Sequence, residues 1–251
     1  MGSYRHELTA EQWAQVSPLL PSDRPRGAFQ PLANRDVVDA ILWILWSGAP
    51  WRDLPDRYPN WKSVHTRFLR WSKAGIWKRV LDAMAVDADD ELAIIDSSIV
   101  RVHMDAVGGK KNGSEQVGRS RGGPTTKIHA VVDGLGNPTK IALTEGQTHD
   151  VTQAPEMLRE SHGRWILADK AYDSDALIAE LDSRGSTPVI PSRRGRRIAR
   201  LHDRAMFKSR FLVEHFFARI KRCRRIATRY EKLSVTYLGM VLLACVLTWL
   251  A

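Results

Sequence analysis

Two aspartates stand at the ends of apolar, strand-like runs. Asp96 follows the apolar residues 93–95, and Asp169 follows the apolar run 165–168. A single aspartate at a strand end can simply start a turn or cap the next helix. Two in one sheet weaken that explanation, because carboxylates on neighbouring strands lie side by side and need a counter-charge, most simply a divalent metal ion.

A third carboxylate, Glu214, is the only acid between Asp203 and Glu231 in an otherwise cationic stretch. On a helix it shares roughly 60° of arc with three other side chains: Phe207, Arg210 and Lys221. An intrahelical Arg210–Glu214 ion pair, contributing about 0.3 kcal/mol, is the alternative role. With Asp96 and Asp169, Glu214 would complete a catalytic set able to hold two Mg²⁺ or Mn²⁺ ions for an in-line displacement at phosphorus.

Four further side chains compete for places in this site. Asp173 is a rival to Asp169, but it follows Ala-Tyr in a turn, where an aspartate more often caps the next helix. His103, His149 and Asp150 are candidates to lie near the metal ions, and a purely structural role fits each of them equally well.

Positive charge is concentrated in one part of the chain. The 251 residues carry a net charge of +10, yet residues 193–232 alone hold fifteen Lys or Arg against three acids. A solvated helix face is one interpretation, but a dense cluster of one sign repels itself, and a polyanion relieves that repulsion. We therefore predict double-stranded DNA as the partner. The cations expected to contact it from this segment are Arg210, Lys221, Arg222, Arg224 and Arg225.

The first ninety residues have helical patterns. Helices are expected near 9–18, 34–48, 60–75 and 76–86. Short helices joined by tight turns are compatible with a helix-turn-helix whose third helix brings Lys62 and Arg67 to a DNA groove. A helical bundle with another role is the alternative. We assign residues 1–90 to a small helical DNA-binding domain.

Residues 91–251 alternate between strands and helices. Strands expected at 92–103, 126–133 and 138–146 form an antiparallel meander, and the Gly- and Lys-rich stretch 108–125 is expected to be an unpacked, mobile loop. The remaining expected elements are a helix at 151–160, a strand at 165–169, a helix at 174–184, a strand at 187–191, a basic helix at 204–229 and an apolar terminal helix. This α/β (α+β) order predicts a ribonuclease-H-like catalytic domain.

The cellular compartment follows from what the sequence lacks. Cys223 and Cys245 are too few for a disulfide framework, and the N-terminus has no signal-peptide pattern. Residues 234–251 are uncharged and nearly long enough to span a bilayer, but they are also typical of a terminal helix packed over a sheet. We predict a cytoplasmic protein without a membrane span.

The chain resembles bacterial insertion-sequence transposases of the DDE type, in the group marked by a Tyr-Arg-Glu-Lys signature on the last catalytic helix. Phe207, Arg210, Glu214 and Lys221 stand at the spacing of that signature, with Phe207 in place of the tyrosine. Further similar blocks lie at 94–103, 118–133, 146–151, 166–174 and 225–233. The resemblance spans nearly the whole chain.

The resemblance implies roles for these residues. Asp96, Asp169 and Glu214 would be the metal ligands, and Arg210 and Lys221 would contact phosphates or bases at the transposon end. The substitution of Phe207 removes any hydrogen bond from a phenol. The short interval between Asp169 and Glu214 leaves no room for the inserted β-domain of some relatives.

The resemblance further implies metal-dependent cleavage at transposon ends, strand transfer into target DNA, and at least two protomers on the DNA. Two other functions stay open on the residues alone. One is a non-catalytic DNA-binding protein, such as a repressor or a domesticated remnant, against which the intact acid triad argues. The other is a nuclease without strand transfer.

Overall fold

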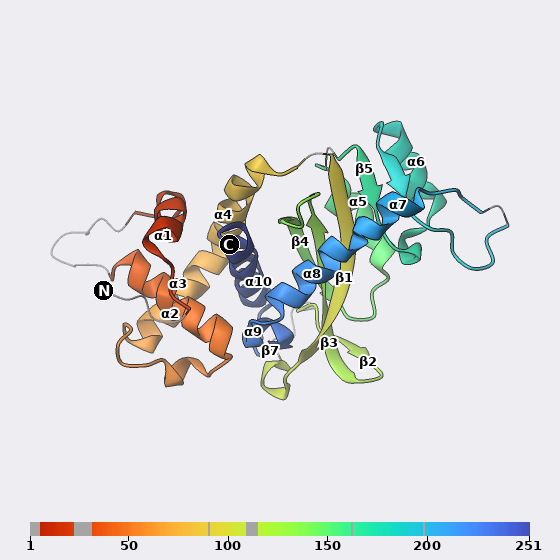
Figure 1. The fold of residues 1–251 in the computed structure, drawn as a ribbon. Helices are drawn as coiled ribbons and strands as arrows, with labels where there is room; N and C mark the ends of the chain where they lie inside the picture. The colour runs from red at the N-terminus through yellow and green to blue at the C-terminus, as the bar shows by residue number, and fades with distance from the viewer. Residues whose placement is uncertain (1–5, 23–31, 90, 109–114, 162, 198) are drawn as a thin grey trace.

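A mixed sheet forms the centre of the computed structural model, which describes residues 6–22, 32–89, 91–108, 115–161, 163–197 and 199–251 (Figure 1). Its strands are β1 (Leu92–Val102), β2 (Gly118–Ser120), β3 (Gly123–Val132), β4 (Pro138–Glu145), β5 (Trp165–Leu167), β6 (Thr187–Val189) and β7 (Thr228–Arg229). β3 is antiparallel to both β1 and β4, whereas β5 and β6 continue parallel to β1 on its other side. The order β4-β3-β1-β5-β6 confirms the predicted meander and ribonuclease-H-like fold.

Alternation along β1 decides what each face of the sheet carries. Ile94 and Val100 belong to the hydrophobic cluster that includes α8 (Phe211–Ile220) and α10 (Ser234–Trp249). Ala93 and Ile95 point to the opposite face, where they pack with α5 (Ala154–Leu158) and α6 (Asp175–Ser183). Successive side chains of a strand point to opposite faces, so residues 94, 96 and 98 all lie under α8.

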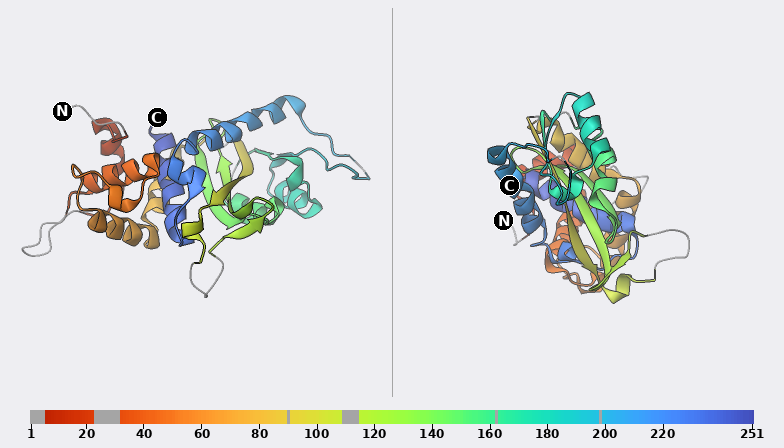
Figure 2. Two further views of the ribbon diagram at one scale, coloured as in Figure 1. Left: turned by 90° about the horizontal axis from the view of Figure 1, so that it is seen from below. Right: turned by 90° about the vertical axis from the view of Figure 1, so that its right-hand side faces the viewer.

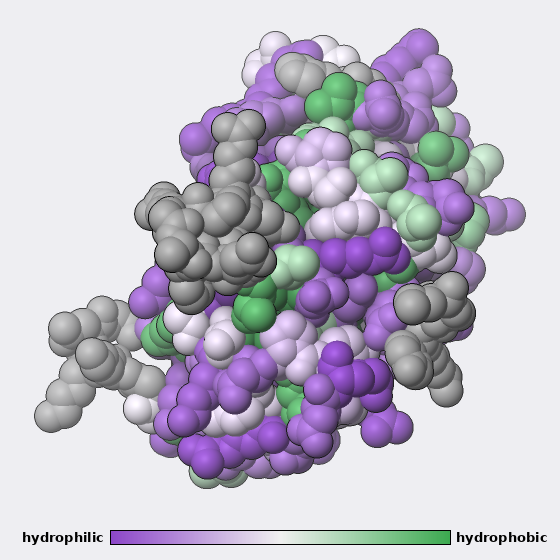
Figure 3. Space-filling view, turned by 90° about the vertical axis from the view of Figure 1, so that its left-hand side faces the viewer, coloured by the Kyte–Doolittle hydropathy of each residue, from purple (hydrophilic) through white to green (hydrophobic). Residues whose placement is uncertain are grey.

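Four helices make up the N-terminal part: α1 (Ala10–Val16), α2 (Asn34–Ser47), α3 (Trp61–Lys73) and α4 (Ile76–Met84). A capping box between Thr9 and Gln12 starts α1. Gly48 ends α2 in the left-handed region, at φ +71°, and a Cβ there would lie only 2.9 Å from the Cβ of Arg224. The face of the molecule on the side of the N-terminal helices is largely hydrophilic (Figure 3).

Helix α10 joins the helical part to the sheet. It lies between them (Figures 1 and 2), and one hydrophobic cluster includes residues of α2, α3, α4, α8, α10 and the sheet. The Tyr237 hydroxyl donates to the carbonyl of Ile226, and the Trp249 indole donates to that of Pro138. The two predicted domains therefore share a core, and their boundary near residue 90 stays a prediction. No helix in the described part of the chain is long and apolar enough to cross a membrane.

The basic segment is divided into several elements. In place of one helix over 204–229, the structure has α7 (Arg204–Phe207), a 3-10 turn at Lys208–Arg210, α8, and then α9 (Arg224–Ala227). The segment ends in β7, which pairs parallel with the end of β1. The expected single helix was wrong here because Cys223 has an extended backbone (φ −71°, ψ 108°), which ends the helical run, and because Arg229 lies in β7. Its guanidinium is fully buried and donates to the Thr126 hydroxyl at 2.8 Å.

Part of the polar stretch 108–125 is packed, contrary to expectation. Gly118 is buried, and β2 pairs with the beginning of β3. The Glu115 carboxylate accepts a hydrogen bond from the first backbone N–H of α10, that of Ser234, at 2.7 Å. Residues 109–114 of this predicted mobile loop lie outside the described residues.

The buried carboxyl of Asp39 on α2 makes stability depend on pH. Burial, with smaller contributions from neighbouring acids, raises its pKa to about 6, although Leu8 N–H donates to it at 3.0 Å. The folded pKa exceeds the unfolded one, so stability falls as pH rises from about 4 to about 6. We expect the free energy of unfolding of Asp39→Asn, relative to that of wild type, to rise by roughly 1–2 kcal/mol between pH 4 and pH 7.

Urea unfolding at pH 4 and pH 7 measures this difference. Asp36→Asn, which removes an exposed carboxylate from the same helix, is the control. An Asp39→Asn advantage that is equal at both pH values would contradict the assignment.

Candidate active site

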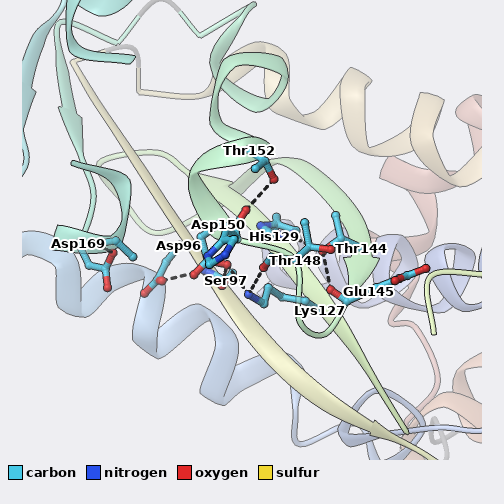
Figure 4. A network of polar contacts seen from close by, with 12 residues as sticks. Asp96, Ser97, Lys127, His129, Thr144, Glu145, Thr148, Asp150, Thr152 and Asp169 are labelled. Atoms are coloured by element: carbon cyan, nitrogen blue, oxygen red, sulfur yellow. Dashed lines mark hydrogen bonds and ion pairs between the residues drawn. The ribbon is translucent and has the colours of Figure 1, made fainter. Parts of the chain in front are cut away.

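Parallel pairing of β1 with β5 brings two of the predicted acids together. Ile94 is the register partner of Leu167, and both belong to the cluster on the α8 face. Asp96 stands two residues further along β1, and Asp169 stands two residues past Leu167, just beyond the end of β5, so their side chains return to that same face. The two carboxyl groups lie close together there, next to α8 (Figure 4).

Asp96 is the more buried of the pair. Its side chain is 18% exposed, and its oxygens accept from the Ser97 N–H at 2.7 Å and from the Arg210 guanidinium at 2.6 Å. Burial raises the pKa of Asp96 and the charge of Asp169 raises it further, against the opposing effect of Arg210. Asp169 accepts from the Ala171 N–H at 2.7 Å and so also caps the next turn. Its capping role and its place beside Asp96 coexist.

Glu214 lies one arginine away from this pair. It stands in the first turn of α8, whose apolar residues Val213, Phe216, Phe217 and Ile220 are buried. The Glu214 side chain is 61% exposed, with an oxygen 3.8 Å from Arg210. Arg210 thus bridges Glu214 and Asp96. Among the described residues, no three His, Cys, Asp or Glu side chains are grouped closely enough to hold a metal ion.

Lys221 fixes the other end of α8 to the same strand. Its ammonium donates to the Ser98 hydroxyl at 2.6 Å and to the Ile99 carbonyl at 3.3 Å, and burial lowers its pKa. Ser98 follows Asp96 by two residues on the same face of β1. Arg210 and Lys221 therefore both attach α8 to the strand that carries Asp96. The guanidinium of Arg210 also lies over the Phe207 ring, at 5.6 Å.

Two cations predicted to contact DNA have partners inside the protein: the burial of Arg225 argues against its contact with DNA, whereas the contact of Arg67 stays a prediction. Arg225 is 6% exposed, and it donates to Glu231 and to the Ala49 carbonyl, both at 2.7 Å. Arg67 donates to the Asn34 side chain at 2.9 Å and to the Leu32 carbonyl at 3.3 Å. The other predicted contacts, Lys62, Arg222 and Arg224, are exposed and stay candidates.

The rival residues separate clearly. Asp173 is fully buried, and its carboxylate accepts a hydrogen bond from the Arg196 Nε at 2.8 Å. Its charge is therefore already paired inside the protein. His103 accepts a hydrogen bond from the Asp105 N–H, and its ring centroid lies 4.8 Å from that of Tyr230 with the planes tilted by 34°, a structural role. His149 is exposed.

A buried polar network lies on the opposite face of β1, beneath Asp96 (Figure 4). The Lys127 ammonium and the Ser97 hydroxyl both donate to one Asp150 oxygen, at 2.7 and 2.8 Å. His129 bonds the Thr144 hydroxyl at 2.8 Å, and burial lowers its pKa to about 4, so the ring is neutral. Sequence reasoning missed Lys127. The signal was Lys and His at alternating positions of an otherwise apolar strand.

Two donors near the acids are left without partners. The Nε of Arg210 and the hydroxyl of Tyr172 are buried and have no hydrogen-bond partner among the described residues. Burial raises the pKa of Tyr172, and the nearby charges of Asp150, Asp96 and Asp169 raise it further. Buried unpaired donors are costly. Arg210 lies beside Asp96, whereas Tyr172 packs in the hydrophobic cluster on the α5 and α6 face.

Fold and site together define the class of the protein. A ribonuclease-H-like sheet with one carboxylate inside β1 and a second just past the end of the neighbouring β5, covered by a basic helical segment, is the arrangement of a polynucleotidyl transferase.

Comparison with known families makes the assignment specific. Residues 8–81 match the family described as “Putative transposase of IS4/5 family”, and residues 87–249 match the family described as “Transposase DDE domain”. The chain belongs to the DDE transposase family, and it is an enzyme of that family.

Individual relatives agree with this membership. The “Putative transposase for insertion sequence element IS6501” of Brucella ovis is 41% identical over 128 residues, covering 50% of this chain and 98% of the relative. The “Putative transposase for insertion sequence element IS402” of Burkholderia cepacia is 32% identical over 152 residues, covering 56% and 69%. A solved piggyBac transposase synaptic complex with hairpin DNA has 16% identity and a TM-score of 0.41, covering 74% of this chain and 47% of that one.

The Lys127–Asp150 pair gives a test of the network under the site. We expect Lys127→Met to lower the free energy of unfolding by about 3 kcal/mol, because it leaves a largely buried carboxylate without its cation. Lys140→Met is the matched control: it breaks the Lys140–Glu160 pair, whose carboxylate is 80% exposed, and should cost under about 1 kcal/mol. Denaturant unfolding compares the two, and equal losses would show that the network contributes nothing special.

Proposed function

We propose that this transposase cuts double-stranded DNA at the ends of its element and joins the freed 3′ ends to target DNA, using Asp96, Asp169 and Glu214. The observation that carries the proposal is the pairing of Asp96 with Asp169 on the face of the sheet that α8 covers. Membership of the DDE family supports it. Joining two ends in one reaction requires at least two protomers on the DNA.

The donor set fits a hard divalent cation such as Mg²⁺ or Mn²⁺. Two carboxylates in contact need positive charge between them, and Mg²⁺ is commonly held by one or two carboxylates with water and substrate phosphate. Asp96 and Asp169 would hold the ion or ions, with Glu214 as the third ligand. When bound, two such ions supply activation of the attacking oxygen and stabilisation of the leaving oxygen.

Arg210 has the contacts of a residue that responds to substrate. In the DNA-free protein it neutralises Asp96 at 2.6 Å and approaches Glu214 at 3.8 Å, while its Nε has no partner. A DNA phosphate offers this guanidinium the acceptors that it lacks. Moving onto the phosphate would release Asp96 and Glu214 together. The Ser97 N–H keeps the Asp96 carboxylate oriented during that exchange.

Glu214→Gln is the direct test. On a labelled duplex carrying the element's end, with Mg²⁺, we expect DNA affinity to be unchanged and both cleavage and joining to fall by roughly a thousandfold, because a metal ligand contributes several kcal/mol to the transition state. Glu156→Gln is a close control, since Glu156 is 60% exposed and paired with Arg159 on α5.

The outcomes separate the functions. Cleavage without joining by the wild type would indicate a nuclease. Binding without cleavage under Mg²⁺ or Mn²⁺ would leave a DNA-binding protein. Full activity of Glu214→Gln would remove Glu214 from the site.

Arg210→Gln tests the exchange of partners. Without DNA, we expect this variant to bind Mn²⁺ roughly tenfold more tightly than wild type, because the competing cation beside Asp96 is gone. Cleavage should nevertheless fall. Isothermal titration calorimetry measures the affinity, and Arg219→Gln, an exposed arginine of α8, is the control. Unchanged Mn²⁺ affinity would contradict competition at Asp96.

A further inference from the structure

The segment between β6 and α7 forms an arginine-rich loop. It projects from the end of the molecule opposite the N-terminal helices (Figures 1 and 2). Arg193, Arg194 and Arg197 are exposed, and in the part of the chain that the structure describes no carboxylate lies within ion-pair distance of them. Gly195, at φ +86°, allows the turn between them.

The base of this loop is held by a buried anion. Asp173 is fully buried and accepts from the Arg193 backbone N–H and from the Arg196 Nε, both at 2.8 Å. Arg200 lies 3.5 Å from its other oxygen, and Arg196 and Arg200 both also bond Asp175. Burial alone would raise the pKa of Asp173, but these donors lower it, so the anion persists.

The five arginines within residues 193–200 thus fall into two groups, those paired with acids and those exposed to solvent. Two of them, Arg196 and Arg200, turn inward and are neutralised by Asp173 and Asp175. The other three turn outward with no described counter-charge. A loop built only for solubility would not need a buried carboxylate to fix its base. Exposed arginines on a fixed base suit an external polyanion with regularly spaced phosphates.

The loop is tied to the active site at both ends. Its anchor, Asp173, follows Asp169 by four residues, with the single turn Lys170–Tyr172 between them. At its other end the chain enters α7, which leads directly to Arg210. Movement of the loop base would therefore move the elements that carry two of the proposed site residues.

We propose that Arg193, Arg194 and Arg197 grip the phosphate backbone of a DNA duplex, with Asp173 as the positioning residue of the loop. This surface is separate from the N-terminal helices and from α8. The proposal rests on the proposed function, because it assigns a second DNA contact to the same enzyme. The contact is independent of base sequence, since arginines at a loop tip reach phosphates without entering a groove.

The test uses the full chain with Arg193, Arg194 and Arg197 all changed to alanine. DNA binding is measured by fluorescence anisotropy over a salt titration. Each lost phosphate contact removes about 0.9 from the slope of log K against log salt, so we expect the slope to decrease by about 2–3 and low-salt affinity to fall at least tenfold. The triple lysine variant should retain most of the slope, since it keeps the charge.

A charge-matched control removes three exposed arginines elsewhere: Arg79, Arg159 and Arg164. Their replacement by alanine should leave the slope near that of wild type. Equal slopes for wild type and the loop variant on both the element-end duplex and an unrelated target duplex, or an equal decrease in the loop and control variants, would overturn the proposal.

Two substrates identify the DNA that the loop holds. Weaker binding of the duplex carrying the element's end places the loop on element DNA. Normal end binding with reduced joining of pre-cleaved ends places it on target DNA. If the wild type cleaves and joins DNA and the loop variant matches it in every assay, only the proposed role of the loop is wrong. If the wild type binds DNA but never cleaves it, the proposed function is wrong. The salt dependence of DNA binding then still tests the role of the loop.

Discussion

Parallel pairing between β1 and β5 brings Asp96, inside β1, and Asp169, just past the end of β5, onto one face of the sheet. Their mutual repulsion, added to the burial of Asp96, is a cost that the fold must offset. Arg210, which stands at the N-cap position of α8, supplies the nearest positive charge. The position of α8 therefore helps to offset the repulsion between the two carboxylates. Placing the two acids together thus requires that α8 lie where Arg210 reaches Asp96.

Helix α8 is held by apolar and polar contacts of different kinds. Its buried residues pack into the cluster shared with α10 and the N-terminal helices, whereas Arg210 and Lys221 bond to β1. The apolar contacts fix the helix against the sheet, and the proposed function requires only the polar contact of Arg210 to be exchanged for phosphate. On the far face of β1, Ser97 and Lys127 share Asp150, which keeps the strand itself in place.

Much of this could be predicted from the sequence because the relevant signals are local. The meander, the strand before Asp169 and the pairing of the two acids all follow from alternation and from apolar runs that end in aspartate. The partner of a long cation is not local. Arg225 and Arg67 look like DNA contacts in the sequence, yet their acceptors lie at Ala49 and Asn34, far along the chain or in another helix.

The same reasoning limits what net charge can say about DNA binding. Residues 193–232 carry fifteen Lys or Arg, but the structure neutralises several of them internally. Arg229 is fully buried, Arg225 nearly so, and Arg196 and Arg200 are paired with acids.

Exposed charge remains at Arg204, Lys208 and Arg219, and also at two places near the ends of this segment, the arginines around α9 and the loop before α7. These places lie on either side of α8, which carries Glu214 (Figure 1). A duplex that met both would cross the face that α8 covers, where Asp96 and Asp169 lie. Internal pairing of Arg196, Arg200 and Arg225 thus lowers the exposed charge of the basic segment and leaves exposed arginines on both sides of the proposed site of cleavage.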